Sequence, residues 1–247
     1  MASHVDPEIV LYDLACTKNV CFSPVVWRIR MILNYKQIPY KTIFLEFPDI
    51  EPTFKGLGIV PSESASAGPI KYTVPAIHHI PTNTHIMESL PIAQFLTTTY
   101  PSPPLPLTSE LGRQIESKAR STIGLSFSAS LMPREIHILS PRSQEYFRRT
   151  REAMVKQPLE NLLEGDKEGK AWEGANENIR AVGEMLLTNR EEGGFVLGKE
   201  PSYTDFFVAG ALQSARVIHE ETFARMVGFS GFGDVYEACL PYMERKD

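Results

Sequence analysis

The sequence predicts an α/β unit followed by an all-helical unit. Over residues 1–100, short runs of β-forming residues alternate with amphipathic helix patterns in the order βαβαββα. Residues 101–107 contain four prolines, which cannot continue a helix and favour a stiff, extended connector. Residues 108–247 show helical periodicity and no convincing strand pattern. We therefore expect two domains, with residues 101–107 as the linker between them.

The composition argues against several classes of function. The 247 residues carry a net charge of −5, so nothing favours nucleic acid or an anionic membrane as a partner. No apolar run approaches the roughly 20 residues that span a bilayer. The beginning of the sequence lacks the basic and apolar parts of a signal peptide, and three cysteines make no disulfide framework. We therefore expect a cytoplasmic protein.

The first strand and helix meet at a polar residue. Residues 8–14 form a short run of β-formers, and the apolar residues after Ser23 recur at helical spacing. Ser23 is a preferred N-cap residue and Pro24 a preferred first helical residue, so a helix is expected to begin here. The Ser23 hydroxyl would then lie beside free backbone N–H groups, where an anion such as a thiolate is stabilised. Helix capping alone is the simpler alternative.

The rest of residues 1–100 completes one recognisable order. Further strands are expected over residues 40–47, 74–80 and 85–87, a short helix over residues 48–57, and a turn-rich segment over residues 59–71. The last two strands should pair as a hairpin, and Glu88 with Ser89 opens the helix that follows. A βαβ unit followed by a hairpin and a helix is the thioredoxin-like arrangement.

The second unit reads as a series of helices. They are expected from Thr108 towards Met132, from Ser143 to Glu164 with a kink at Pro158, from Lys170 to Asn189, and after Ser202. Ser202 with Asp205 three residues later resembles a capping box before a very apolar helix. The run from Leu125 to Met132 should face the first unit, where it either lines an apolar pocket or belongs to the core.

These features together resemble the glutathione transferases, in which a thioredoxin-like domain precedes an all-helical one. Val74-Pro75 matches the cis-proline before the third strand, Glu88-Ser89 the pair that opens the third helix, and residues 202–206 the capping box of the buried helix. Residues 23–28 and 33–36 look most like the bacterial β-etherases and the fungal etherase-like and FuA-related transferases, and residues 47–52 and 57–58 favour the fungal side. Such transferases occur in fungal secondary-metabolite pathways, including the pseurotin pathway.

The resemblance implies glutathione as the cofactor and Ser23 as the catalytic residue. A free thiol has a pKa of about 8.5, so little of it is thiolate at neutral pH. A hydrogen bond from the Ser23 hydroxyl to the glutathione sulfur would favour the thiolate. Attack on a hydrophobic electrophile would then give conjugation, ether cleavage, or cis–trans isomerisation by addition and elimination. The superfamily also implies a homodimer.

The same resemblance assigns the remaining glutathione contacts. A cis bond between Val74 and Pro75 would let the Val74 backbone pair with the cysteine of the tripeptide. Glu88 would accept from the α-ammonium, and the Ser89 hydroxyl and N–H would bind the α-carboxylate. Either Lys55 or Lys71 would bind the glycine carboxylate.

The sequence indicates the residues of the substrate pocket less clearly than those of the glutathione site. Trp27 either packs between the domains or contacts the substrate. Phe127, Leu131 and Met132 are the candidates for an apolar lining. The serine-rich insert over residues 61–68 departs from the etherase pattern at the rim of the pocket.

Two alternatives remain open at this point. Cys21 lies two residues before Ser23, and in cysteine-type members of the superfamily a thiol near this helix start forms a mixed disulfide with glutathione. Other transferase-like domains are non-catalytic binding or assembly modules.

The six histidines show no metal-ligand spacing, and adjacent His78 and His79 on a strand should point to opposite faces, so no metal site is expected.

Overall fold

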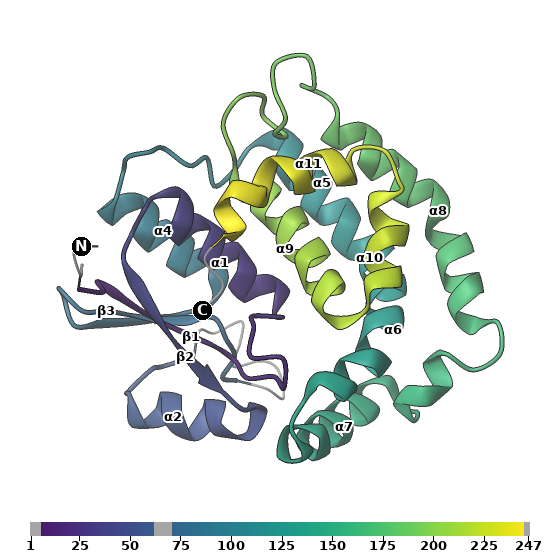
Figure 1. Ribbon diagram of the computed structural model, residues 1–247, viewed down its shortest axis with the longest axis horizontal. Coiled ribbons are helices and arrows are strands. Elements are labelled where there is room, and N and C mark those ends of the chain that lie inside the picture. The colour runs from purple at the N-terminus through teal and green to yellow at the C-terminus, as the bar shows by residue number, and fades with distance from the viewer. Residues whose placement is uncertain (1–5, 62–70, 245–247) are drawn as a thin grey trace.

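A computed structural model describes residues 6–61 and 71–244, and shows a mixed sheet with helices beside an all-helical domain (Figure 1). The elements of the first domain are β1 (Ile9–Leu14), α1 (Pro24–Tyr35), β2 (Tyr40–Leu45), α2 (Ile50–Gly56), β3 (Ala76–His79), β4 (Thr84–Met87) and α4 (Ser89–Thr99). The strand order is β2-β1-β3-β4, parallel between β1 and β2 and antiparallel elsewhere. Helices α1 and α4 cover one face of the sheet and α2 the other. The predicted order βαβαββα is confirmed. Residues 62–70, most of the serine-rich insert, lie outside the described residues.

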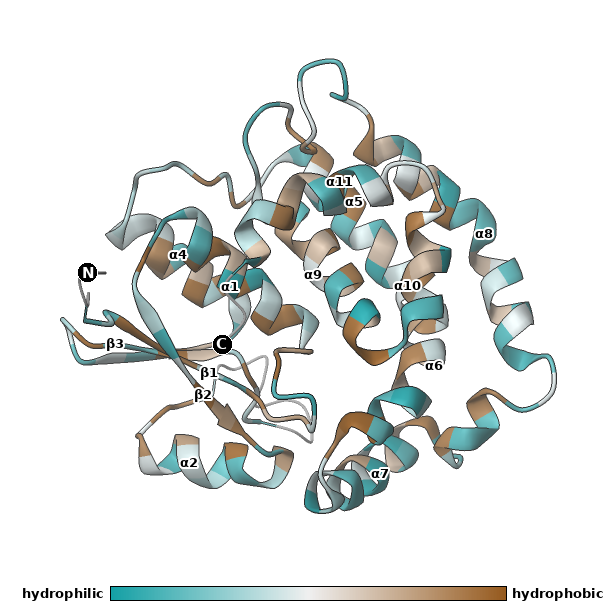
Figure 2. Cartoon of the chain, viewed as in Figure 1, coloured by the Kyte–Doolittle hydropathy of each residue, from teal (hydrophilic) through white to brown (hydrophobic). Residues whose placement is uncertain are grey.

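The second domain contains only helices among its described residues. They are α5 (Glu110–Lys118), the π-helical turn η2 (Ala119–Ile123), α6 (Gly124–Glu135), α7 (Pro141–Val155), α8 (Lys167–Leu186), α9 (Tyr203–Ile218), α10 (Glu220–Val227) and α11 (Phe232–Cys239), with short 3₁₀ turns between some of them. Hydrophobic residues gather on the central helix α9, whereas the outer helix α8 is largely hydrophilic (Figure 2). None of the described helices is long and apolar enough to cross a membrane.

The helix predicted from Thr108 to Met132 is broken in two. Its N-cap is Ser109, whose hydroxyl accepts a hydrogen bond of 2.9 Å from the Gly112 N–H. The π-helical turn follows, where the Thr122 hydroxyl donates to the Lys118 carbonyl at 2.6 Å. Hydroxyl groups that bond to carbonyls of the preceding turn compete with helical hydrogen bonds. Such bonds accompany the irregular geometry between α5 and α6.

The kink predicted at Pro158 is instead a helix end. Helix α7 stops at Val155, and Lys156 adopts a left-handed conformation with φ of 56°. Proline lacks an N–H group and disfavours helical geometry in the residue before it, so the chain leaves the helix ahead of Pro158. A 3₁₀ turn over Leu159–Leu162 follows.

The predicted capping box opens α9. The Asp205 carboxylate accepts hydrogen bonds from the Ser202 N–H and from the Val196 N–H, each at 2.7 Å. The Ser202 hydroxyl donates to the same carboxylate at 2.6 Å. These bonds fix the start of the helix that packs most extensively on the first domain.

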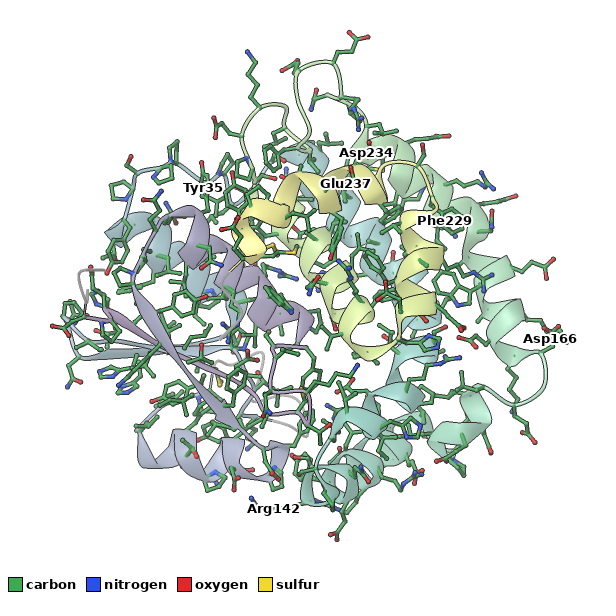
Figure 3. The ribbon with its side chains drawn as sticks, in the orientation of Figure 1. Tyr35, Arg142, Asp166, Phe229, Asp234 and Glu237 are labelled. Atoms are coloured by element: carbon green, nitrogen blue, oxygen red, sulfur yellow. The ribbon has the colours of Figure 1, made fainter. Side chains whose placement is uncertain are left out.

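The proline-rich connector lies against the end of α1. The Lys36 ammonium donates to the carbonyls of Tyr100 and Pro103, both at 2.7 Å. Tyr35, labelled in Figure 3, donates to the Pro104 carbonyl at 3.0 Å. The connector is therefore attached to the first domain rather than extending freely.

Helices α1 and α9 approach closely at a glycine. A Cβ atom added at Gly210 would lie 2.7 Å from the Pro24 carbonyl oxygen and 3.4 Å from the Trp27 Cβ. Atoms do not pack at 2.7 Å in this way, so a larger residue would have to separate the helices. Only glycine fits this contact, which holds the beginning of α1 on the helical domain.

We expect Gly210→Ala to lower the free energy of unfolding by about 1–3 kcal/mol, the usual cost of overpacking a core. Gly174→Ala in the exposed part of α8 is the matched control, because nothing lies within 4 Å of its added Cβ. That control should stabilise by about 0.5–1 kcal/mol through the better helix propensity of alanine. Urea denaturation measures both. Equal stability of the two variants would contradict the close contact.

Candidate active site

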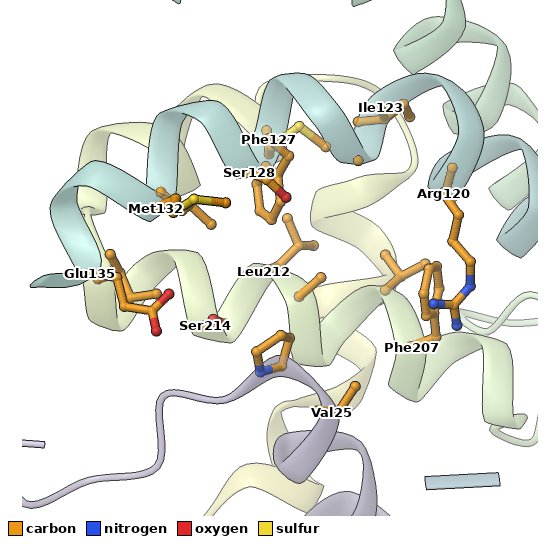
Figure 4. A pocket seen from close by; sticks show the side chains of 18 of the residues that line it. Val25, Arg120, Ile123, Phe127, Ser128, Met132, Glu135, Phe207, Leu212 and Ser214 are labelled. Atoms are coloured by element: carbon orange, nitrogen blue, oxygen red, sulfur yellow. The ribbon is translucent and has the colours of Figure 1, made fainter. Parts of the chain in front are cut away.

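Two cavities adjoin at the start of α1. The serine cavity, of about 310 Å³, is lined by Leu14, Phe22, Ser23, Pro24, Val25, Phe47, Ile50, Tyr72, Thr73, Val74, Glu135, Tyr146, Arg151 and Ser214. The apolar cavity, of about 330 Å³, lies mainly among α1, α6 and α9 (Figure 4). Both are lined by Pro24, Val25, Glu135, Arg151 and Ser214. A ligand in one cavity therefore lies next to a ligand in the other.

Ser23 is the N-cap of α1 and lines the serine cavity. Its hydroxyl oxygen accepts from the Val26 N–H at 3.4 Å, a long hydrogen bond that leaves the hydroxyl proton available to a ligand. The start of α1 carries the positive end of the helix dipole, which favours an anion beside Ser23. Arg151 adds a positive charge to the cavity wall. The Ser23 hydroxyl, the helix start and Arg151 thus all favour negative charge in this cavity.

Val74 lines the same cavity as Ser23, and its bond to Pro75 is cis. The Pro75 carbonyl accepts from the Glu88 N–H at 3.1 Å, which places Glu88 directly beside the proline. Glu88 has φ of 75°, an uncommon conformation for a residue other than glycine. The strand ends therefore bring Val74, Pro75 and Glu88 together, as the sequence predicts.

Ser89 is the first residue of α4 and lies at the domain interface. Its hydroxyl oxygen accepts from the Tyr203 hydroxyl at 3.2 Å and weakly from the Arg28 guanidinium at 3.5 Å. Because both bonds use the oxygen as acceptor, the Ser89 proton remains free to donate. Glu88 and Ser89 line neither cavity, so they border the site rather than forming its walls.

The two candidate lysines differ in position. Lys55 forms an ion pair of 2.6 Å with Glu51, and its ammonium lies 5.8 Å from the centre of the Tyr72 ring. Tyr72 lines the serine cavity, which puts Lys55 near its rim. Lys71 is exposed and lines neither cavity.

The residues expected to form the apolar lining differ in where the structure places them. Phe127, Leu131 and Met132 line the apolar cavity from α6. Trp27 lines neither cavity, which agrees with packing between the domains, one of the two roles expected for it. Its indole is fully buried and donates to the Cys21 carbonyl at 3.0 Å. At this helix position the side chain points into the packing between α1 and α9 instead.

Cys21 is a poor candidate for a reactive thiol. It is fully buried, and its sulfur lies 3.8 Å from the Ser23 carbonyl oxygen. Burial and the neighbouring Asp13 carboxylate raise the pKa of this thiol well above its ordinary value. Since the thiolate is the reactive form, Cys21 lacks the ionisation and the access that a mixed disulfide requires.

Sequence reasoning missed Glu135 and Arg151, which line both cavities. Glu135 follows Leu131 and Met132 by one helical turn and therefore lies on the same face of the helix. This spacing could have indicated that Glu135 reaches the pocket. Burial raises the pKa of Glu135 to about 7, and the nearby charge of Arg151 offsets part of that rise. Arg151 comes from α7, whose place beside α6 no local pattern specifies.

The described part of the chain contains no group of side chains that could hold a metal ion. Across residues 6–61 and 71–244, no three His, Cys, Asp or Glu side chains converge as metal ligands would. His78 stacks on His85 with ring centres 4.2 Å apart, whereas His79 contacts the Tyr100 hydroxyl at 3.0 Å.

Comparison with known proteins gives the family. Models of the glutathione S-transferase N-terminal and C-terminal domains match residues 22–99 and 112–232. The glutathione S-transferase-like protein ustS of Aspergillus flavus is 32% identical over 240 residues, covering 89% of this chain and 84% of that protein. The chain therefore belongs to the glutathione S-transferase family.

Solved structures of fungal transferases superpose on nearly the whole chain. The glutathione S-transferase CsGST63524 of Ceriporiopsis subvermispora, determined in complex with glutathione, is 28% identical with a TM-score of 0.85, over 97% of this chain and 99% of that one. The glutathione transferase GSTFuA2 of Phanerochaete chrysosporium is 29% identical with a TM-score of 0.84, over 98% and 100%.

Proposed function

We propose that the chain is a glutathione-dependent transferase in which Ser23 stabilises the glutathione thiolate. The observation that carries the proposal is the position of Ser23 at a helix start, in the wall of a cavity that adjoins an apolar one. Glutathione would occupy the serine cavity and a hydrophobic electrophile the apolar cavity. Conjugation, ether cleavage and cis–trans isomerisation of an activated olefin all begin with the same attack by sulfur.

The residues around the serine cavity are suited to the remaining contacts with glutathione. The Val74 backbone would pair with the cysteine of glutathione, next to Pro75. Glu88 would accept from the α-ammonium, and its positive φ of 75° is a strained backbone conformation of the kind that clusters at ligand sites. Ser89 would donate to the α-carboxylate. For the glycine carboxylate we favour Lys55, because it lies beside Tyr72 at the rim.

A non-catalytic module and a Cys21-dependent transferase are the alternatives. A purely structural module needs neither a hydroxyl at this helix start nor an adjoining apolar cavity, and Cys21 is buried. We further propose a cytoplasmic homodimer related to the fungal etherase-like transferases, as the sequence resemblance implies. A fungal secondary metabolite would suit the apolar cavity as electrophile.

We expect Ser23→Ala to lower kcat/KM at pH 7 by about ten- to a hundredfold. Losing one hydrogen bond to a charged group costs roughly 1.5–3 kcal/mol, and each 1.36 kcal/mol is about tenfold in rate. The loss should shrink at higher pH, where the thiol ionises unaided. Turnover of chlorodinitrobenzene measures it.

Three variants control for other causes of that loss. Ser109→Ala deletes an equivalent N-cap bond at a residue outside both linings and should keep the wild-type activity. Ser23→Thr restores a hydroxyl and should recover part of the rate. Cys21→Ala should remain active. Loss of activity in Cys21→Ala alone, with Ser23→Ala intact, would reverse the assignment.

We expect Glu88→Ala and Ser89→Ala each to weaken glutathione binding by about 1–3 kcal/mol, the range for losing a partner of a charged group. Tyr203→Phe is the matched control, because it removes the bond to the Ser89 oxygen while leaving the Ser89 hydroxyl. It should weaken binding less than Ser89→Ala does. Calorimetry that finds unchanged affinity in both alanine variants would reject this site.

A further inference from the structure

The wall shared by the two cavities contains one carboxyl group. Among the residues that the structure describes, Glu135 is the one acidic residue that lines either cavity, and it lines both. Its side chain extends from the end of α6 into the cavity, on the same side as Ser214 and towards the start of α1 (Figure 4). Ser23 caps that same helix start. Glu135 therefore borders the place where the thiol and the electrophile would meet.

This carboxyl has no fixed partner among the described residues. It makes no hydrogen bond and no ion pair within 4 Å to any residue in the described part of the chain, although it is half-buried. Carboxyl groups in such positions are normally paired. The charged and titratable groups that share its cavities are Arg151 and Tyr146 from α7, Tyr72 before β3, and Arg28 and Arg120 farther along the apolar cavity. Its free oxygens are thus available to a ligand.

We propose that Glu135 acts as the proton donor when the electrophile is an α,β-unsaturated carbonyl compound. The inference rests on the proposed function, since it assigns a role in the same reaction. Compounds of this class develop negative charge on oxygen when sulfur attacks them, and a neutral carboxyl beside the reacting atoms can neutralise that charge. The arginines of the lining can attract that charge but do not give up a proton, whereas Glu135 can.

The step balances without any further reactant. The thiolate sulfur forms a bond to the β-carbon, and the C=C π pair shifts so that the negative charge reaches the carbonyl oxygen. That oxygen takes the proton from Glu135, and the resulting enol rearranges to the carbonyl product. The Glu135 carboxylate then regains a proton from solvent, which had received the proton of the thiol.

Electrostatics favour the required protonation states. The raised pKa of Glu135, about 7, leaves much of the carboxyl neutral near neutral pH. A thiolate bound close by repels a second negative charge, so it would raise that pKa further. A thiolate at Ser23 and a neutral acid at Glu135 can therefore coexist, as attack followed by proton donation demands.

The test compares two electrophiles in Glu135→Gln and in the wild type. Benzylideneacetone, an enone, needs a proton, whereas chlorodinitrobenzene releases chloride without one. We expect kcat/KM for the enone to fall by about a hundredfold or more, in the range for general acid catalysis. The ratio of enone to chloroarene rates should fall by at least about tenfold. Glu145→Gln, the same change at an exposed position on α7 outside both linings, should keep the wild-type ratio.

The pH dependence provides a readout that a structural role would not change. With the enone, the wild-type rate should rise as the thiol ionises and fall as Glu135 loses its proton. The falling limb should vanish in Glu135→Gln and return, shifted, in Glu135→Asp. Equal losses of kcat/KM with both electrophiles, or an unchanged falling limb in Glu135→Gln, would overturn the role of Glu135. Either result would leave the proposed function of Ser23 standing. A wild type that converts neither electrophile would overturn the proposed function and this inference with it.

Discussion

The close contact between α1 and α9 determines where the chemistry can occur. Gly210 lets the Pro24 carbonyl approach α9, so the first turn of α1 is held between the domains. Ser23 caps that turn, and the two cavities lie on either side of the residues that follow it. If the helices were farther apart, the serine hydroxyl and the apolar lining from α6 would no longer border one another.

This arrangement places the side chains of Ser23 and Cys21 in different environments. Ser23 faces a cavity that Arg151 and the helix start make favourable to an anion. Cys21, two residues earlier, is directed into the core, where burial keeps its thiol protonated. The direction in which each side chain leaves the loop, more than its intrinsic reactivity, separates the proposed catalytic residue from a structural one.

Local patterns predicted the first domain well, because its strands and helices begin at strong signals such as Ser23-Pro24 and Glu88-Ser89. They predicted the second domain less well. Its breaks near Ala119 and Pro158 are changes of backbone geometry that the periodicity of apolar residues does not indicate. No local pattern predicted the place of Arg151 in the site, because it depends on how α7 packs beside α6.

The most direct test of the account is the pKa of the glutathione thiol when bound to the protein, measured from the ultraviolet absorbance of the thiolate across pH. A free thiol titrates at about 8.5. If Ser23 stabilises the thiolate, the bound pKa should be at least about one unit lower in the wild type, a stabilisation of about 1.4 kcal/mol, and the shift should be smaller in Ser23→Ala. A bound thiol that titrates like the free one, or identically in both proteins, would contradict the central role of Ser23.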